Sequence, residues 1–194
     1  MPRIELVLGD ITRQHVDVVV NAANSSLLGG AGVDGAIHEA AGPALQAACR
    51  ALRSDEYPHG LPAGQAVATP AGDLPTRWVV HTVGPLYEPG EDRSDVLASC
   101  YRESLRLADQ LGAETIAFPA VSTGVYRWPV QDAAAIAVAA VLSTPTQVRE
   151  VRFVLFTEPV YEAFEAALGE TAIDLTTGTD LTATAPGLLV PPAS

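Results

Sequence analysis

Lysine is absent from this chain of 194 residues, and its 11 cationic side chains are all arginines scattered along the sequence. Set against 23 acidic residues, they leave a formal net charge of −12 at pH 7. Electrostatic attachment to nucleic acid depends on clustered lysine and arginine, so we expect no nucleic-acid binding. A phosphate ligand would have to be held by backbone N–H groups and helix dipoles rather than by a basic patch.

Cysteine is also scarce, since the chain has only Cys49 and Cys100, each inside a predicted helix. We therefore expect neither a disulfide framework nor a zinc site, and we interpret both residues as small core side chains. No apolar run approaches the roughly 20 residues of a membrane span, and the first residues show no signal-peptide pattern. These absences predict a cytoplasmic protein without membrane contact, which we expect to be a monomer.

Hydrophobic residues make up 48% of the chain and charged residues 18%, which is typical of one globular domain of this length. Apolar runs typical of strands alternate with helical patterns. Strands are predicted at 4–8, 16–20, 65–69, 78–83, 115–118 and 151–156, and helices at 33–53 with a break at Gly42-Pro43, 97–108, 130–142 and 158–168. This alternation favours a three-layer α/β/α sandwich around a mixed, mainly parallel central sheet.

The composition changes near the C-terminal end. We expect the last helix to stop at Gly169, and from Thr171 to Ser194 the chain is rich in Thr, Ala, Pro and Gly with no basic residue. Such a segment buries too little apolar surface to order itself. We therefore divide the chain into a domain of residues 1–170 and a flexible tail of residues 171–194.

The most informative stretch runs from Asn21 to His38 and joins a buried strand to a glycine-rich turn and a helix start. Ligands gather at the carboxyl ends of strands in open α/β sheets. Gly29, Gly30 and Gly32 allow the backbone to approach a ligand closely, and the first N–H groups of the following helix have no partner within the helix. A helix start of this kind suits a phosphate.

A second glycine-containing turn, from Ser122 to Tyr126, follows another predicted strand. Taken alone it is more often only a turn, but its consecutive N–H groups are able to form an anion-binding nest. It lacks the lysine pattern of a nucleotide triphosphatase loop. We therefore expect no metal-assisted phosphoryl transfer, no metal and no cofactor.

Four polar side chains of the first stretch are candidates for chemistry. Asn21 and Asn24 both donate and accept hydrogen bonds, which suits the hydroxyls of a sugar, although either residue serves equally well in a turn. Asp34 lies near a helix start, where the helix dipole favours the charged form; we expect a weak base there, or simply a partner for that dipole. His38, four residues later, shares its helical face and is interpreted as a supporting or structural group.

Three further segments occur in a fixed order around this stretch: Gly9-Asp10-Ile11-Thr12, His81-Thr82-Val83-Gly84-Pro85 and the run from Phe118 to Tyr126. Together the motifs resemble the macrodomain family, specifically its MacroD-type branch, over about residues 4–168. The resemblance implies a mixed sheet between helices, and a protein that binds ADP-ribose and hydrolyses ADP-ribosyl esters, on Asp or Glu of ADP-ribosylated proteins and in O-acetyl-ADP-ribose. The alternative is a module that binds ADP-ribose without turnover.

The resemblance also implies roles for individual residues. Asp10 would accept the adenine amino group, Ile11 would give the adjacent backbone contact, and Phe156 would form an aromatic wall. Without the resemblance, Asp10 is typical of a turn or cap and Phe156 of the core. The implied diphosphate contacts are Gly30, Ala31, Gly32, Val33, Ser122, Thr123, Gly124, Val125 and Tyr126.

The reacting ribose would be held by Asn21, Asn24 and Asp34, with His38 in support. Because we expect Asp34 to be a weak base, we expect esters to be cleaved and arginine-linked ADP-ribose, whose leaving group needs an acid, to stay intact.

Two departures from the resemblance bear on substrate preference. Ala31 stands where close relatives usually have glycine, which removes a conformationally permissive position. Arg127-Trp128 replaces a glycine followed by an aromatic residue. We expect this pair to place a cation and a large aromatic side chain beside the distal ribose loop.

Overall fold

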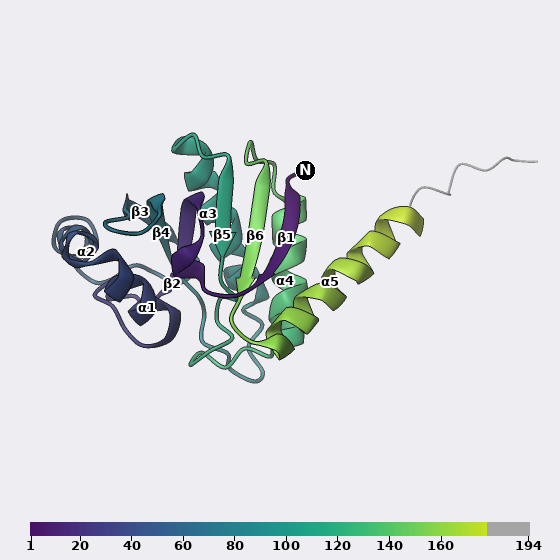
Figure 1. The fold of residues 1–194 in the computed structure, drawn as a ribbon. Helices are drawn as coiled ribbons and strands as arrows, with labels where there is room; N and C mark the ends of the chain where they lie inside the picture. Colours follow the sequence, from purple (N-terminus) through teal and green to yellow (C-terminus); the bar gives the residue numbers. More distant parts are fainter. Residues whose placement is uncertain (178–194) are drawn as a thin grey trace, which may run out of the picture.

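The structure, a computed structural model, describes residues 1–177, whose strands form one six-stranded sheet (Figure 1). Across the sheet the order is β1-β6-β5-β2-β4-β3. The strands are β1 (Arg3–Leu8), β2 (Val16–Ala23), β3 (Ala66–Pro70), β4 (Thr76–Val83), β5 (Thr115–Phe118) and β6 (Glu150–Leu155). Every neighbouring pair is parallel except the edge pair β3 and β4, so the carboxyl ends of five strands meet at one edge.

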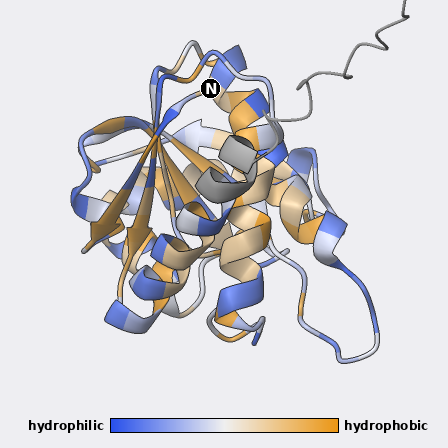
Figure 2. Cartoon of the chain, turned by 90° about the vertical axis from the view of Figure 1, so that its right-hand side faces the viewer, coloured by the Kyte–Doolittle hydropathy of each residue, from blue (hydrophilic) through white to orange (hydrophobic). Residues whose placement is uncertain are grey.

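Helices cover both faces of this sheet. They are η1 (Ile11–Arg13), α1 (Gly32–Ala41), α2 (Pro43–Asp55), α3 (Ser94–Gln110), α4 (Val130–Ser143) and α5 (Glu158–Thr177). Helices α1 and α2 pack on one face, and α3, α4 and α5 on the other. Figure 2 shows the strands mainly in the hydrophobic colour, with hydrophilic segments on the outer helices and loops.

The central strand β2 contributes to both cores by simple alternation. Val18 and Val20 belong to the core under α3, α4 and α5, whereas Val19 belongs to the core under α1 and α2. Successive side chains of a strand point to opposite faces, so a β-branched run without polar relief has to be covered on both sides. The predicted three-layer α/β/α sandwich with a mixed, mainly parallel sheet is confirmed. Cys49 and Cys100 are buried free thiols within the two cores.

Strand β2 extends further than its apolar run. It continues to Ala23 because Asn21, Ala22 and Ala23 pair with His81, Thr82 and Val83 of β4. The motif asparagine Asn21 thus lies inside a strand, where its surroundings are set by the neighbouring strand.

Strand β6 ends one residue earlier than predicted. The strand stops at Leu155, and Phe156 is 86% exposed, so the interpretation of Phe156 as a core residue is wrong.

The prediction that the last helix stops at Gly169 is wrong as well. Helix α5 runs on to Thr177, since a glycine inside a helix costs only about 1 kcal/mol relative to alanine and does not break it. Residues 171–177 of the predicted tail therefore belong to α5, and its remainder, 178–194, lies outside the described residues. None of the helices within 1–177 combines the length and apolar character that spanning a membrane requires.

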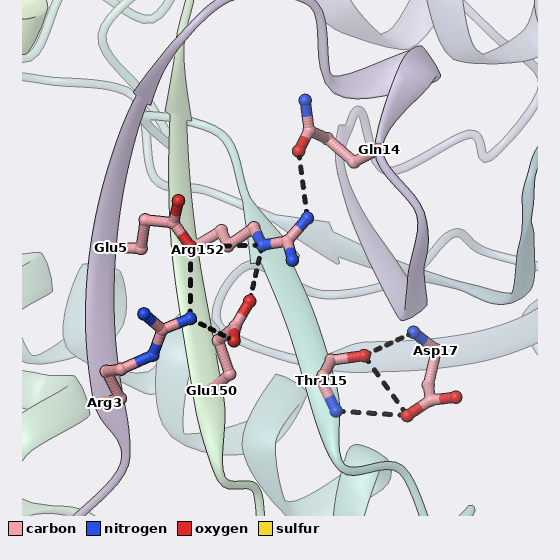
Figure 3. Close-up of polar contacts among 7 residues, drawn as sticks. All are labelled: Arg3, Glu5, Gln14, Asp17, Thr115, Glu150 and Arg152. Atoms are coloured by element: carbon pink, nitrogen blue, oxygen red, sulfur yellow. Dashed lines mark hydrogen bonds and ion pairs between the residues drawn. The ribbon is translucent and has the colours of Figure 1, made fainter.

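Polar side chains join the strands at the amino edge of the sheet, opposite the carboxyl ends (Figure 3). Asp17 Oδ2 accepts hydrogen bonds from the backbone N–H groups of Glu114 and Thr115, at 2.9 and 3.1 Å, and from the Thr115 hydroxyl. Arg152 Nε donates to Glu150 at 2.6 Å and lies 3.5 Å from Glu5 of the edge strand. These contacts join β2 to β5 and β1 to β6 at a distance from the loops at the carboxyl edge.

Replacing Asp17 by alanine is expected to lower the free energy of unfolding by about 1–3 kcal/mol, because two backbone N–H groups lose their acceptor. Asp17→Asn keeps an acceptor oxygen and should cost less. Urea unfolding of both variants tests this order. Equal stability of Asp17→Ala and the parent chain would show that water replaces the carboxylate without loss.

Candidate functional site

A cavity of about 290 Å³ opens at the carboxyl edge of the sheet. Its walls come from the end of β2, the start of α1, the residue after β4 and the loop after β5. The lining residues are Ala22, Ala23, Asn24, Gly30, Ala31, Gly32, Val33, Asp34, Gly84, Ala120, Val121, Ser122, Gly124, Val125 and Tyr126. The structure therefore brings together the two predicted loops, while the hydroxyl of Thr123 turns back to donate to Ala120 O at 2.9 Å.

The first loop ends where α1 begins at Gly32. Ala31 is the N-cap residue, and its side chain caps no backbone group, so no side chain takes the first N–H groups of the helix. Ala31 has φ −99°, which alanine adopts without strain, so its departure from glycine costs nothing in backbone conformation. Gly35, by contrast, has to be glycine because an added Cβ would lie 2.6 Å from the carbonyl oxygen of Gly30.

The second loop is held in an unusual backbone conformation. Ser122 has φ +66° and Arg127 has φ +60°, in the left-handed region that favours glycine. The backbone N–H of Trp128 donates to Ser122 O at 3.0 Å, which closes the loop. A Cβ on Gly84 would collide with Ser122 Oγ, so glycine at this position lets the end of β4 pack directly against the loop.

The side chain of Trp128 does not line the cavity. It is 4% exposed, its indole Nε1 donates to Asp132 at 2.7 Å, and its ring meets Tyr87 edge-on with centroids 5.5 Å apart. Trp128 therefore adjoins the second loop, but its side chain packs into the core under α4. Arg127 remains exposed on the loop, but it does not line the cavity.

Asp34 is the buried carboxylate of the cavity wall, with its side chain 6% exposed. Asn21 Nδ2 donates one hydrogen to Asp34 Oδ1 at 2.7 Å and the other to His81 Nδ1 at 3.1 Å. Because an amide nitrogen only donates, His81 Nδ1 accepts, and the ring proton lies on Nε2, which is 2.9 Å from Thr69 Oγ1. Burial lowers the pKa of His81 to about 3, so this histidine is neutral throughout the physiological range.

Asn21 does not line the cavity. It is fully buried, and its amide hydrogens are used on Asp34 and His81. We expected Asn21 either to hold the loop or to reach the sugar. In the structure its amide instead positions the carboxylate of Asp34. The sequence analysis gave His81 no role. The available signal was a histidine directly after the apolar run Trp78-Val79-Val80 of a predicted strand. In the structure this histidine is the register partner of Asn21.

The expectation that Asp34 is a weak base is also wrong. Burial raises its pKa, and this effect outweighs the hydrogen bond from Asn21 and the nearby His38, which both act in the opposite direction. His38 does share the helical face of Asp34, with Nε2 3.4 Å from Asp34 Oδ1. With the pKa of Asp34 raised, the reason given for sparing arginine-linked ADP-ribose no longer holds.

Asn24 has its predicted turn role and also lines the cavity. Its Oδ1 accepts from the backbone N–H and the hydroxyl of Ser26, and its Nδ2 donates to Gly29 O at 3.0 Å, so the side chain shapes the turn. It also lines the cavity, with Nδ2 close to Gly30. One amide N–H remains to meet a ligand.

His38, Cys49 and His81 lie close together behind Asp34, with potential metal-ligand atoms within 4.8 Å of one another. Both ring nitrogens of His81 already have partners in Asn21 and Thr69. Burial raises the pKa of the Cys49 thiol to about 11, so it is protonated at neutral pH. Metal binding needs a thiolate and free nitrogen lone pairs, so we interpret this cluster as packed core.

Asp10, Ile11 and Phe156 lie on the same edge but outside the cavity. Because β1 and β6 are neighbours, their carboxyl ends bring Asp10 and Phe156 to the same part of the edge. Asp10 Oδ1 caps η1 by accepting from Thr12 N and Oγ1, and these bonds lower its pKa. The Asp10 side chain is 45% exposed, whereas Ile11 is buried.

Replacing Asp34 by asparagine is expected to stabilise the fold at neutral pH, because the amide keeps the acceptor for Asn21 without burying a charge. The raised pKa of folded Asp34 means that the parent chain loses stability as pH rises from about 4, the ordinary value, through the folded pKa. The advantage of Asp34→Asn should therefore grow over that interval. Urea unfolding between pH 4 and 8 measures it, with Glu39→Gln on the exposed face of α1 as control. An advantage that shrinks with rising pH would contradict the assignment.

Comparison with known proteins gives a consistent result. The Macro domain family model matches residues 20–137. A macro domain-containing protein of Streptomyces nogalater is 68% identical over 170 residues, which cover 88% of this chain and 94% of the relative. A protein of Enterobacter cloacae named O-acetyl-ADP-ribose deacetylase is 47% identical over 90% of this chain and 98% of its own.

A solved structure also matches the fold of this chain. A variant of the Oceanobacillus iheyensis macrodomain with ADP-ribose superposes with a TM-score of 0.84 at 43% identity, covering 88% of this chain and 94% of that one. The family model covers more than half of the sequence, and the relatives are matched over nearly their whole length. The chain therefore belongs to the macro domain family.

Proposed function

We propose that this protein binds ADP-ribose and hydrolyses ADP-ribosyl esters, both on Asp or Glu side chains of modified proteins and in O-acetyl-ADP-ribose. The observation that carries the proposal is the buried carboxylate of Asp34, placed in the wall of a cavity between two loops of backbone N–H groups. The named deacetylase among the relatives and the ADP-ribose in the similar structure support it.

The sheet order supports one orientation of the ligand. Along the carboxyl edge, Asp10 and Phe156 stand at β1 and β6, the second loop follows β5, and Asn24 and Asp34 follow β2. Adenine, diphosphate and distal ribose are arranged in the same linear order in ADP-ribose. Asp10 Oδ2 accepts no hydrogen bond from the described residues, so it is available to accept one from the adenine amino group. Ile11 contributes a backbone contact, and the exposed ring of Phe156 stacks on the base.

The diphosphate lies between Gly30–Val33 and Ser122–Tyr126. The start of α1 supplies N–H groups that no side chain caps, and the strained second loop supplies the opposite wall. No lysine exists to neutralise the phosphates, and the chain carries a net charge of −12. Backbone dipoles within a cavity are the remaining source of positive potential, and they are screened less by salt than exposed side chains.

The chemistry centres on Asp34. Its Oδ1 is held by Asn21, and Oδ2 lies beside Gly30 at the cavity wall. A raised pKa makes this carboxylate a better general base than a free one, so it takes a proton from the attacking water. The hydroxyl of the water bonds to the ester carbonyl carbon, the C–O bond to the ribose breaks, and the ribose oxygen takes the proton that Asp34 received. The products are a carboxylic acid and ADP-ribose. Asn24 orients the ribose, and His38 stands behind the carboxylate at 3.4 Å.

The competing function is a reader that binds ADP-ribose without turnover. It is favoured if Asp34 lies too far from the ester to deliver its proton. A cytoplasmic location and a monomeric state remain predictions of the sequence analysis.

Asp10→Ala is expected to weaken ADP-ribose binding by about 1.5–3 kcal/mol, because a hydrogen bond to a charged acceptor is lost. Binding of pyrophosphate, which has no adenine, should not change. Calorimetric titration of both ligands tests the prediction. Equal ADP-ribose affinity in the variant and the parent chain would remove Asp10 from the site.

Asp34→Asn is expected to lower the turnover of O-acetyl-ADP-ribose by about 10²–10⁴, while most of the ADP-ribose affinity remains. The same variant should be the more stable protein, so the loss is not one of folding. Glu39→Gln removes an exposed carboxylate from the same helix and should keep the parental rate. Parental turnover in Asp34→Asn would exclude the mechanism, and intact binding without any release by the parent chain would establish the reader.

A further inference from the structure

A second cavity, of about 510 Å³, adjoins the first at the carboxyl edge. The two share Gly84 and Tyr126, which form the partition between them. On the far side of that partition the walls come from the loop before β3 and from the segment between β4 and α3, including His59, Pro85 and Arg93. The proposed function assigns nothing to this space.

The position of the second cavity follows from the order of the strands. The ligand orientation proposed above runs from β1 and β6 through β5 to β2, where the distal ribose meets Asp34. The next strand along the edge is β4, and the second cavity begins at its end, with Val83 and Gly84. It therefore lies beyond the ribose, on the side opposite the diphosphate, where a group attached to the ribose emerges.

The partition is built as a fixed element of the site. The backbone N–H of Tyr87 donates to Tyr126 O at 2.9 Å, and Gly84 packs against Val121 and Ser122. Tyr126 and Asp34 line the same first cavity. Partial burial, and after it the carboxylate of Asp34, raises the pKa of the Tyr126 phenol. The second cavity thus begins directly beside the proposed chemistry.

Arg93 gives the second cavity its charge. Most arginines in the described part of the chain form ion pairs, namely Arg3, Arg13, Arg77, Arg102, Arg106, Arg149 and Arg152. Arg93 forms none there; its Nη1 makes only a long contact, 3.5 Å, to the carbonyl of Leu86. The adjacent carboxylate of Asp92 is turned to the backbone N–H of Ser94. In a chain of net charge −12, a half-buried cation without a counter-ion marks a place for an anion.

We propose that the second cavity binds the polypeptide that carries the ADP-ribosyl ester, and that Arg93 recognises the carboxylate of an acidic residue next to the modified one. The inference rests on the proposed function, in which ADP-ribose occupies the adjacent first cavity. An acetyl group explains neither feature: it is small beside a cavity larger than the first, and its only carboxyl group is consumed in the ester. An acidic peptide segment explains both the volume and the unpaired cation.

The test compares three substrates with the parent chain and Arg93→Gln. They are a peptide esterified with ADP-ribose on Glu between acidic residues, the same peptide with neutral neighbours, and O-acetyl-ADP-ribose. Arg93→Gln should raise KM for the acidic peptide about tenfold, the equivalent of one charge-assisted hydrogen bond, at unchanged kcat. The other two substrates should change less than about twofold. Arg50→Gln, the same charge change on α2 away from both cavities, should leave all three unchanged.

Each other outcome overturns the inference. An equal rise in KM for O-acetyl-ADP-ribose would place Arg93 in the ADP-ribose site itself. An equal rise for the neutral peptide would show that Arg93 does not recognise a neighbouring carboxylate. No change with any substrate would leave the polypeptide outside this cavity. If the parent chain hydrolyses none of them, the proposed function fails separately, and calorimetry then decides the inference: an acidic peptide joined to ADP-ribose by a non-hydrolysable amide must bind more tightly than free ADP-ribose, and Arg93→Gln must abolish the difference.

Discussion

The burial of one carboxylate shapes the candidate site. Asp34 lies in the cavity wall with little contact to water, a position that penalises its charged form and raises its pKa. The fold offsets part of this cost with the amide of Asn21, which is itself held by neutral His81. These partners come from β2 and β4, so the register of two parallel strands fixes the oxygen that faces the ligand.

Stabilising polar contacts and the proposed ligand contacts lie at opposite edges of the sheet. The amino edge carries the hydrogen bonds of Asp17 and the ion pairs of Arg152, which join neighbouring strands (Figure 3). The carboxyl edge carries loops with left-handed residues, an uncapped helix start and an exposed aromatic ring. Such features are costly in isolation, and a rigid sheet that is anchored elsewhere tolerates them.

A protein of net charge −12 that binds acidic ligands, as proposed, needs positive groups at the points of contact. In the proposed scheme the phosphates meet backbone N–H groups, whose dipoles are fixed by the fold, and the single unpaired cation of the second cavity is kept for the polypeptide. The two cavities meet at Gly84 and Tyr126, beside Asp34. Recognition of the nucleotide and of its carrier therefore converges on the bond to be broken.

The sequence by itself determined what depends on local patterns: the alternation of strands and helices, the double burial of β2, and the two glycine loops that line one cavity. Only the tertiary structure decided the direction of the Asp34 pKa shift, the positions of Asn21 and Trp128, the exposure of Phe156, and the part played by His81. These properties depend on burial and on partners distant in the chain. A helix dipole or a turn propensity is inferred from neighbouring residues alone and gives no information about either. The two loops were recognisable because backbone conformation demands glycine at specific places, whereas the protonation and orientation of side chains follow from what packs around them.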